Sequence, residues 1–421
     1  MAANTNLSRE QLQYLVTTPL YLGGADPRAP GDARVYVRPV VAQWRWWFRA
    51  LAAGVFGTTR NGLAQVRARE QQFFGGVHKV GEAATGPMGF RVRLAEQQLN
   101  KPVEFTANRD PVLNYLGFGL GSTQKEVARL GIPPGSRFTL EVVTSEKMWD
   151  LLCVLNYFWV NFGGLGARHR RGLGSIEWIS PAVNQPPQDG RLARGMLDRF
   201  RQLIDAGDPQ PSFGEIPEMP VVHPGWFRVK LAATSFSGWK QALAAIRHQL
   251  RIEAKEPPPP PLHLGRRGFG YRQGDGASHR WVQEFKRFPD GRTFPYYPTR
   301  DKEAAWQLFQ ALKRGREEDV NVSLVNPLFG LPVVFGGWNL SITAYQDKDE
   351  IRRPSPLSFR VFRSGNSYRV AIVYFKSRFL PQNSSLRAVW NGRRECTVNL
   401  GAGWDYLDRF FDCCKGTEVK L

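Results

Sequence analysis

The stretch Gly163-Gly164-Leu165-Gly166-Ala167-Arg168-His169-Arg170-Arg171-Gly172-Leu173-Gly174 combines five glycines with three arginines and one histidine. Glycine lets the backbone adopt positive φ and approach a ligand closely, and arginine carries a permanent charge on a planar group that suits phosphate. The stretch directly follows an apolar run with helical spacing. It therefore predicts a glycine-rich loop that binds a polyanion.

The elements on both sides of this loop follow the order strand, helix, strand, strand, helix, strand. Period-two alternation and helical spacing predict strands over 12–16, 90–94, 137–143 and 175–179 and helices over 41–54 and 145–162. This is the βαββαβ order of the ferredoxin-like fold, which also underlies RNA-recognition domains. We expect residues 1–186 to form one such domain, with the loop 163–174 between its second helix and last strand.

The remainder of the chain begins to repeat this order. After a connecting region over 187–220, the pattern predicts a strand over 226–232, helices over 238–256, 301–314 and 404–414, and a hairpin of 357–362 with 368–375. We expect a second ferredoxin-like domain over 221–421. The predicted fold class is α+β, with tandem ferredoxin-like (RRM-like) domains and long insertions.

One insertion, residues 257–300, opens with five consecutive prolines, Pro257 to Pro261. Polyproline is extended and stiff, and the segment after it is basic, glycine-rich and aromatic. We expect a mobile loop over the binding face. Its arginines would contact nucleic acid and two aromatic side chains would stack on bases: Arg266, Arg267, Arg272, Phe269 and Tyr271.

The first predicted helix has two distinct sides. Trp44, Trp47 and Phe48 recur on one face, which predicts that they lie in the core, with base-stacking platforms as the alternative. Arg45 and Arg49 stand one turn apart on another side. We expect these two arginines to contact a nucleic acid.

Overall charge agrees with a polyanionic partner. The chain has 57 Lys and Arg against 37 Asp and Glu, a net charge of +20, which attracts nucleic acid or an anionic surface. The N-terminus lacks the pattern of a signal peptide, and no apolar run approaches the ~20 residues of a membrane helix. We expect a soluble, cytoplasmic protein.

Motifs for metal or cofactor chemistry are missing from the sequence. Its four cysteines form no Cys-x-x-Cys pair, so reduced thiols are expected and neither a metal nor a cofactor is predicted. The loop lacks the Walker pattern, and a Rossmann fingerprint would precede a helix rather than follow one. The alternative for the loop is a solvated turn with incidental charge.

Two kinds of side chain could support catalysis. His169 could act as general acid or base in attack by an RNA 2′-hydroxyl, but a polar contact to phosphate or sugar is the favoured interpretation. Asp26 and Asp32 follow the first strand and could assist metal-dependent cleavage. Such loop aspartates are more often turn formers.

Several separated segments resemble the RAMP superfamily of CRISPR-associated proteins and, within it, the first subunits of type III-B Cmr complexes. They are Thr18 to Ala25, Arg38 to Leu51 with its arginines and tryptophans, the glycine-rich loop, and more weakly Asn326 to Pro332 with Arg352 to Leu357. Together they span both expected domains.

The resemblance implies a non-catalytic subunit of a hetero-oligomeric CRISPR effector complex that serves antiviral defence. Such a subunit holds the 3′ region of the guide RNA and helps engage complementary target RNA, while a neighbouring subunit cleaves the target. Two alternatives are a RAMP-type endoribonuclease that uses His169 or a loop aspartate, and a stand-alone basic nucleic-acid-binding protein.

A guide RNA must be held whatever its sequence, which calls for contacts to phosphate and sugar rather than to base edges. The expected RNA-binding residues are accordingly Arg38, Arg45, Arg49, Gly163, Gly164, Gly166, Arg168, His169, Arg170, Arg171, Gly172, Gly174, Arg266, Arg267 and Arg272.

Overall fold

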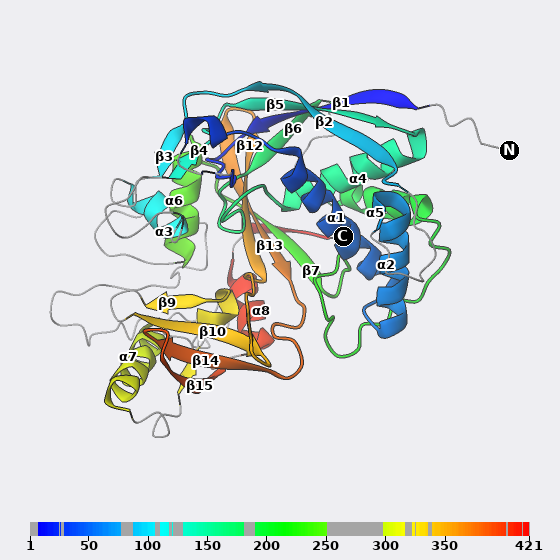
Figure 1. The fold of residues 1–421 in the computed structure, drawn as a ribbon. Helices are drawn as coiled ribbons and strands as arrows, with labels where there is room; N and C mark the ends of the chain where they lie inside the picture. The colour runs from blue at the N-terminus through cyan, green and yellow to red at the C-terminus, as the bar shows by residue number, and fades with distance from the viewer. Residues whose placement is uncertain are drawn as a thin grey trace. The chain divides into compact units, whose positions relative to one another are not determined.

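The computed structural model divides into two compact units (Figure 1). Unit 1 comprises Met1–Ile246, Ser358–Phe375 and Thr417–Leu421, and unit 2 comprises Arg247–Leu357 and Lys376–Gly416. The structure describes residues 7–24, 26, 29–76, 87–105, 110–117, 120, 129–180, 190–250, 298–315, 322–324, 326–335, 339–400, 403–414 and 416–420.

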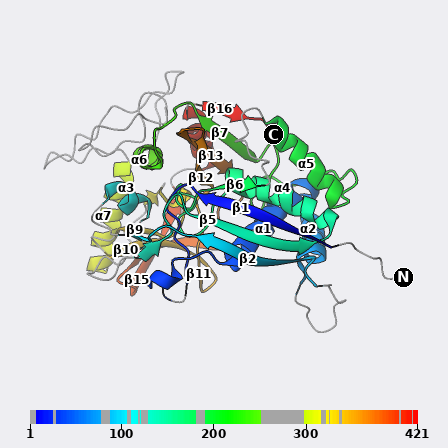
Figure 2. The ribbon, with the colours of Figure 1, turned by 90° about the horizontal axis from the view of Figure 1, so that it is seen from above.

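The first sheet of unit 1 has four strands in the order β2-β5-β1-β6 (Figure 2). In chain order its elements are β1 (Ser8–Val16), α1 (Val37–Phe56), β2 (Phe90–Gln98), β5 (Arg137–Thr144), α4 (Glu146–Phe162) and β6 (Ile176–Ser180). Strand β1 pairs antiparallel with both β5 and β6, and β2 pairs antiparallel with β5. The first and last strands of the motif are therefore neighbours, as a ferredoxin-like βαββαβ unit requires.

Helix α1 forms because its apolar side chains recur on one face. Trp44, Trp47 and Phe48 are all buried, which confirms the predicted core positions. A second helix, α2 (Arg60–Phe74), follows after a break at Gly57, where φ is +82°. The Thr59 hydroxyl caps α2 by accepting a hydrogen bond of 3.4 Å from the amide of Gly62. The sequence did not predict α2.

Short elements fill the connections of this first motif. A 3-10 turn η1 (Pro30–Asp32) precedes α1, and β3 (Val103–Phe105), α3 (Pro111–Leu116) and β4 (Arg129–Gly131) lie between β2 and β5. Strands β3 and β4 form a two-stranded sheet of their own. Helix α5 (Arg191–Leu203), in the region that was expected to connect the two domains, packs against α4 and α1.

A second four-stranded sheet has the order β12-β13-β7-β16. Its motif runs β7 (Phe227–Ala232), α6 (Trp239–Leu250), β12 (Leu357–Ser364), β13 (Ser367–Phe375), α8 (Trp404–Cys413) and β16 (Gly416–Val419). The strand order repeats that of the first sheet, with the first and last strands again adjacent. The predicted hairpin is β12 and β13, with Gly365 at φ +59° in the turn. The α+β fold class is therefore confirmed.

Unit 2 holds a separate six-stranded sheet, in the order β11-β10-β14-β15-β8 with β9 paired to β10. Its elements are α7 (Pro298–Arg314), β8 (Ser323–Leu324), η3 (Asn326–Phe329), β9 (Val333–Phe335), β10 (Leu340–Gln346), β11 (Asp349–Ile351), β14 (Ser384–Trp390) and β15 (Arg394–Leu400), and helix α8 also falls within unit 2. Helix α7 was predicted, but these strands were not. Most of the proline-rich insertion, residues 257–297, lies outside the described residues.

Among the helices that the structure describes, none combines the length and the apolar character needed to span a bilayer.

Candidate nucleic-acid interface

The glycine-rich loop is fastened to the segment that follows β1. The amide of Ala167 donates to the Tyr21 carbonyl at 2.8 Å, and the amide of Gly174 donates to the Pro19 carbonyl at 2.8 Å. The Thr18 hydroxyl donates to the Gly172 carbonyl at 2.8 Å. These bonds fix both arms of the loop, so its shape is set before any ligand binds.

The loop glycines make this close packing possible. Gly166 and Gly174 have φ of +80° and +60°, and a Cβ at Gly174 would lie 1.8 Å from the Leu165 carbonyl oxygen. A Cβ at Gly172 would lie 2.6 Å from Ile246 Cδ1. At Gly163 the nearest atom would be the Trp159 carbonyl oxygen and at Gly164 it would be His169 Cβ. The glycines therefore allow the protein to approach its own backbone, whereas the sequence analysis attributed them to close approach of a ligand.

The loop carries three arginines, which differ in their exposure to solvent. Arg168 is exposed and adopts φ of +60°, a left-handed conformation that is uncommon for a residue with a side chain. The Arg170 guanidinium lies 5.9 Å from the centre of the Trp46 ring on α1. Arg170 and Arg171 are half-buried. Cationic and aromatic groups thus meet between the loop and α1.

The loop also runs along the edge strand of the second sheet. The amide of Phe359 in β12 donates to the Arg170 carbonyl at 2.9 Å, and Arg171 forms a parallel bridge with Phe359. The Ser175 hydroxyl accepts from the amide of Val361 at 3.1 Å. The arginine segment is therefore held from both sides by main-chain bonds.

His169 is placed as a structural group. Its Nδ1 lies 2.9 Å from the Gly166 carbonyl oxygen, which can only accept, so Nδ1 carries the proton. Burial, together with the neighbouring Arg170 charge, lowers the pKa of His169 to about 4. The imidazole is therefore neutral at pH 7, so it does not carry the second proton that an imidazolium would donate as a general acid, and its Nε2 is the unprotonated nitrogen.

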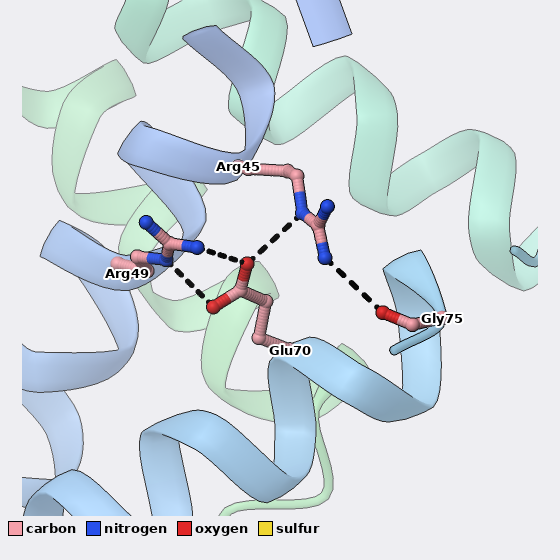
Figure 3. Close-up of polar contacts among 4 residues, drawn as sticks. All are labelled: Arg45, Arg49, Glu70 and Gly75. Atoms are coloured by element: carbon pink, nitrogen blue, oxygen red, sulfur yellow. Dashed lines mark hydrogen bonds and ion pairs between the residues drawn. The ribbon is translucent and has the colours of Figure 1, made fainter. Parts of the chain in front are cut away.

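Arg45 and Arg49 are engaged by a carboxylate from α2 (Figure 3). Glu70 accepts from Arg49 Nε and Nη2 at 2.6 and 2.7 Å, and from Arg45 Nε at 3.0 Å. Arg45 Nη2 also donates to the Gly75 carbonyl at 3.1 Å. Two arginines and one buried glutamate leave one net positive charge here. The cluster fastens α2 to α1, and RNA contact by these arginines stays a prediction.

Glu70 is a residue that sequence reasoning missed. Its side chain is 9% exposed, against 36% for Arg45 and 48% for Arg49. Since α2 was not predicted, Glu70 could not be placed opposite the two arginines. The sequence offered one indication of this role: Glu70 lies three and four residues before Phe73 and Phe74, so on a helix it would share their buried face.

The other candidate residues fall into two groups. Arg38 is exposed in the first turn of α1, whereas Arg266, Arg267 and Arg272 lie outside the described residues, as do Phe269 and Tyr271.

Asp32 behaves as a turn former. Its carboxylate accepts from the Asp26 amide at 2.6 Å and from the Tyr36 hydroxyl at 3.1 Å. These hydrogen bonds lower the pKa of Asp32, the bond from the Asp26 amide most. Within the described ranges, no group of three or more His, Cys, Asp or Glu side chains could hold a metal ion.

Comparison with known proteins identifies the class of this fold and loop. Residues 15–177, which run from the end of β1 to the start of β6 and include the glycine-rich loop, match the model of the RAMP superfamily. The resemblance seen in the sequence is confirmed.

Two curated relatives are CRISPR system Cmr subunits of Pyrococcus furiosus. The chain is 28% identical over 176 residues to Cmr1-2, covering 38% of this chain and 89% of that protein. It is 30% identical over 166 residues to Cmr1-1, covering 38% of this chain and 45% of that protein.

A solved structure shares the fold over nearly the whole chain. It is apo Cmr1 from Pyrococcus furiosus, with a TM-score of 0.53 at 17% identity and coverage of 98% of both chains.

Proposed function

We propose that this chain is a non-catalytic, RNA-binding subunit of a type III-B CRISPR effector complex in the cytoplasm. It holds the 3′ region of the guide RNA and helps complementary target RNA to engage, together with other effector subunits. The proposal rests on the arginines of the glycine-rich loop and on the hydrogen bonds that hold this loop in place. The names of the Cmr1 relatives support it.

The observation that carries the proposal is the contact of Arg170 with Trp46, in a loop that also exposes Arg168. Arg168 is exposed in a loop whose arms are fixed by main-chain hydrogen bonds. Arg170 lies over the Trp46 ring. Arginine beside an aromatic ring suits a single strand, because phosphate and base contacts are then available together.

This arrangement also suits a guide of any sequence. Guanidinium groups bind phosphate irrespective of the base attached to it, and stacking on an aromatic ring tolerates all four bases. Main-chain bonds from β12 hold the loop in place, so little ordering would be needed on binding.

The test replaces the three loop arginines with uncharged glutamine, which leaves the main-chain hydrogen bonds of the loop in place. The variant R168Q/R170Q/R171Q should bind single-stranded RNA of any sequence more weakly. The slope of log affinity against log salt should become less steep by up to about 0.7 per lost phosphate contact. Affinity is measured by fluorescence anisotropy on one labelled RNA at four salt concentrations.

A matched variant controls for net charge. R60Q/R67Q/R191Q removes three exposed arginines from α2 and α5, and should leave the slope unchanged. If both variants lose the same affinity and slope, the loop assignment is wrong.

The non-catalytic part of the proposal has its own test. The wild-type chain, incubated with guide and target RNA with and without Mg²⁺, should leave both strands intact. Cleavage that disappears in H169A, D26A or D32A would instead establish an endoribonuclease. Purification from the native host should recover related subunits and a short RNA, and recovery of the chain alone would favour a stand-alone binding protein.

A further inference from the structure

The first sheet of unit 1 has one face that carries a set of arginines. Helices α1, α2, α4 and α5 lie on the other side of this sheet (Figure 1). In the register of β2, β5 and β1, Val143 lies between Arg9 and Arg91, and Glu141 lies between Gln11 and Arg93. Because alternate residues of a strand point to the same side, these rows share the outer face.

A buried carboxylate organises two of these arginines. Glu141 accepts from Arg93 Nε at 2.8 Å and Nη2 at 3.0 Å, and Arg9 Nη1 lies 3.6 Å from its Oε2. The Glu141 side chain is 9% exposed, whereas Arg93 is 68% and Arg9 is 66% exposed. The guanidinium of Arg93 is therefore held in one orientation and still faces solvent.

The outer face has a surplus of positive charge. Arg91 and Arg137 are exposed and share the face with Arg9 and Arg93, while Glu141 and Glu96 are the acidic residues of the same three strands on this side. Four arginines against two glutamates leave a net charge of about +2. Gln11, Gln13 and Thr139 add hydrogen-bonding groups between the charges.

We infer that this outer face binds the sugar-phosphate backbone of single-stranded RNA, as a second contact surface in addition to the glycine-rich loop. The inference rests on the proposed function, which it deepens by assigning a further stretch of RNA to β1, β2 and β5. Arg91, Arg93 and Arg137 contact phosphates, and the glutamines and threonine contact ribose hydroxyls.

Chemistry favours RNA over a protein partner here. The fully buried core of a protein interface is usually apolar and contains aromatic anchors. Four rows of side chains from β1, β5 and β2 share this face. The two central rows contain arginine, glutamine, glutamate and threonine, and the aliphatic side chains Val143 and Leu15 lie in the two end rows. Charged and polar rows without an apolar centre fit a sugar-phosphate chain.

The test uses the two arginines that the Glu141 cluster does not include. R91Q/R137Q should bind a labelled, random-sequence 40-nucleotide RNA more weakly than the wild type. Its slope of log affinity against log salt should be less steep by up to about 1.4, which corresponds to two phosphate contacts on a single strand. R60Q/R67Q, with the same net charge, should keep the wild-type slope.

Different failures are distinguishable. If the wild type binds RNA, R168Q/R170Q/R171Q weakens that binding and R91Q/R137Q does not, the outer-face inference is overturned and the proposed function stands. If the wild type binds no RNA, both are overturned. If R91Q/R137Q loses binding to labelled poly-glutamate and keeps RNA binding, the face binds an acidic protein surface and the RNA inference is wrong.

Discussion

Arg360 in β12 donates a hydrogen bond of 2.7 Å from Nε to the carbonyl oxygen of Val160, in the last turn of α4. Its Nη1 donates to the Val361 carbonyl at 3.0 Å, and the residue is 2% exposed. A cation at a helix C-terminus also interacts favourably with the helix dipole. The buried Arg360 therefore connects β12 of the second βαββαβ motif to the end of α4 in the first motif. The glycine-rich loop begins directly after this end of α4.

We predict that R360M destabilises the protein. Methionine fills similar space but leaves the Val160 and Val361 carbonyls without this donor, and the expected loss of unfolding free energy is about 1–3 kcal/mol. Urea denaturation followed by tryptophan fluorescence measures it. The matched variant R363M removes an arginine that is 44% exposed and pairs with Glu177, and should cost less than about 1 kcal/mol. Equal costs would contradict the assigned role.

Gly174 provides a test of the loop's packing. In G174A the new Cβ would overlap the Leu165 carbonyl oxygen at a residue with positive φ, so we expect a loss of at least about 2 kcal/mol. G195A is the control, because Gly195 lies in α5 with open space around it. This control should stabilise the protein by about 0.5–1 kcal/mol. A thermal-denaturation midpoint for G174A at or above the wild-type value would refute the packing argument.

Glu70 should matter for stability rather than for RNA affinity. E70Q removes the charge that Arg45 and Arg49 share, and we expect a loss of about 1–2 kcal/mol after allowing for the solvent exposure of both arginines. D205N, which weakens the exposed pair of Asp205 with Lys147, should cost less than about 1 kcal/mol.

RNA titration of E70Q provides a second measurement. If Arg45 and Arg49 contact RNA, releasing them from Glu70 should leave affinity unchanged or raise it. A marked fall in affinity with unchanged stability would show that Glu70 itself orients the RNA-binding surface.

His169 predicts a defined dependence of stability on pH. Its pKa in the folded protein is about 4, below the ordinary 6.5. Between these values the unfolded chain binds a proton that the folded chain does not, so the contribution is complete above pH 6.5 and decreases as the pH falls towards 4. The loss amounts to at most about 3 kcal/mol.

The variant H169Q isolates this contribution. Its stability should decrease less steeply than that of the wild type from pH 6.5 to pH 4, in urea denaturation at half-unit steps. Parallel curves for the two proteins would mean that the folded imidazole titrates normally.

The sequence predicted those parts of the fold in which periodicity and burial coincide. Trp44, Trp47 and Phe48 recur on one side of α1 and are buried as expected. By contrast, the buried side of α2 consists of Gly62, Val66, Glu70, Phe73 and Phe74. A glycine and a glutamate interrupt its apolar pattern, so the helix could not be recognised from hydrophobic spacing.

For the candidate site, the sequence indicated the composition of the loop but not the contacts that the loop makes. Glycines and arginines at 163–174 indicated a special loop, but the partners of Gly166 and Gly174 are the carbonyls of Tyr21 and Leu165. The partner of Arg170 on β12 lies much further along the chain. Such pairings depend on tertiary structure, which local patterns do not report. In unit 2, β14 and β15 mix polar and apolar residues, which concealed their strands.

The bond between Ser175 and Val361 spans 186 residues. A ribosome adds about 5–20 residues per second, so the arginine loop emerges roughly 10–40 s before β12 is available to brace it. During that interval the nascent chain carries the loop's charges without the support of β12. The complete set of contacts around this arginine-bearing loop therefore forms only when synthesis of the chain is nearly finished.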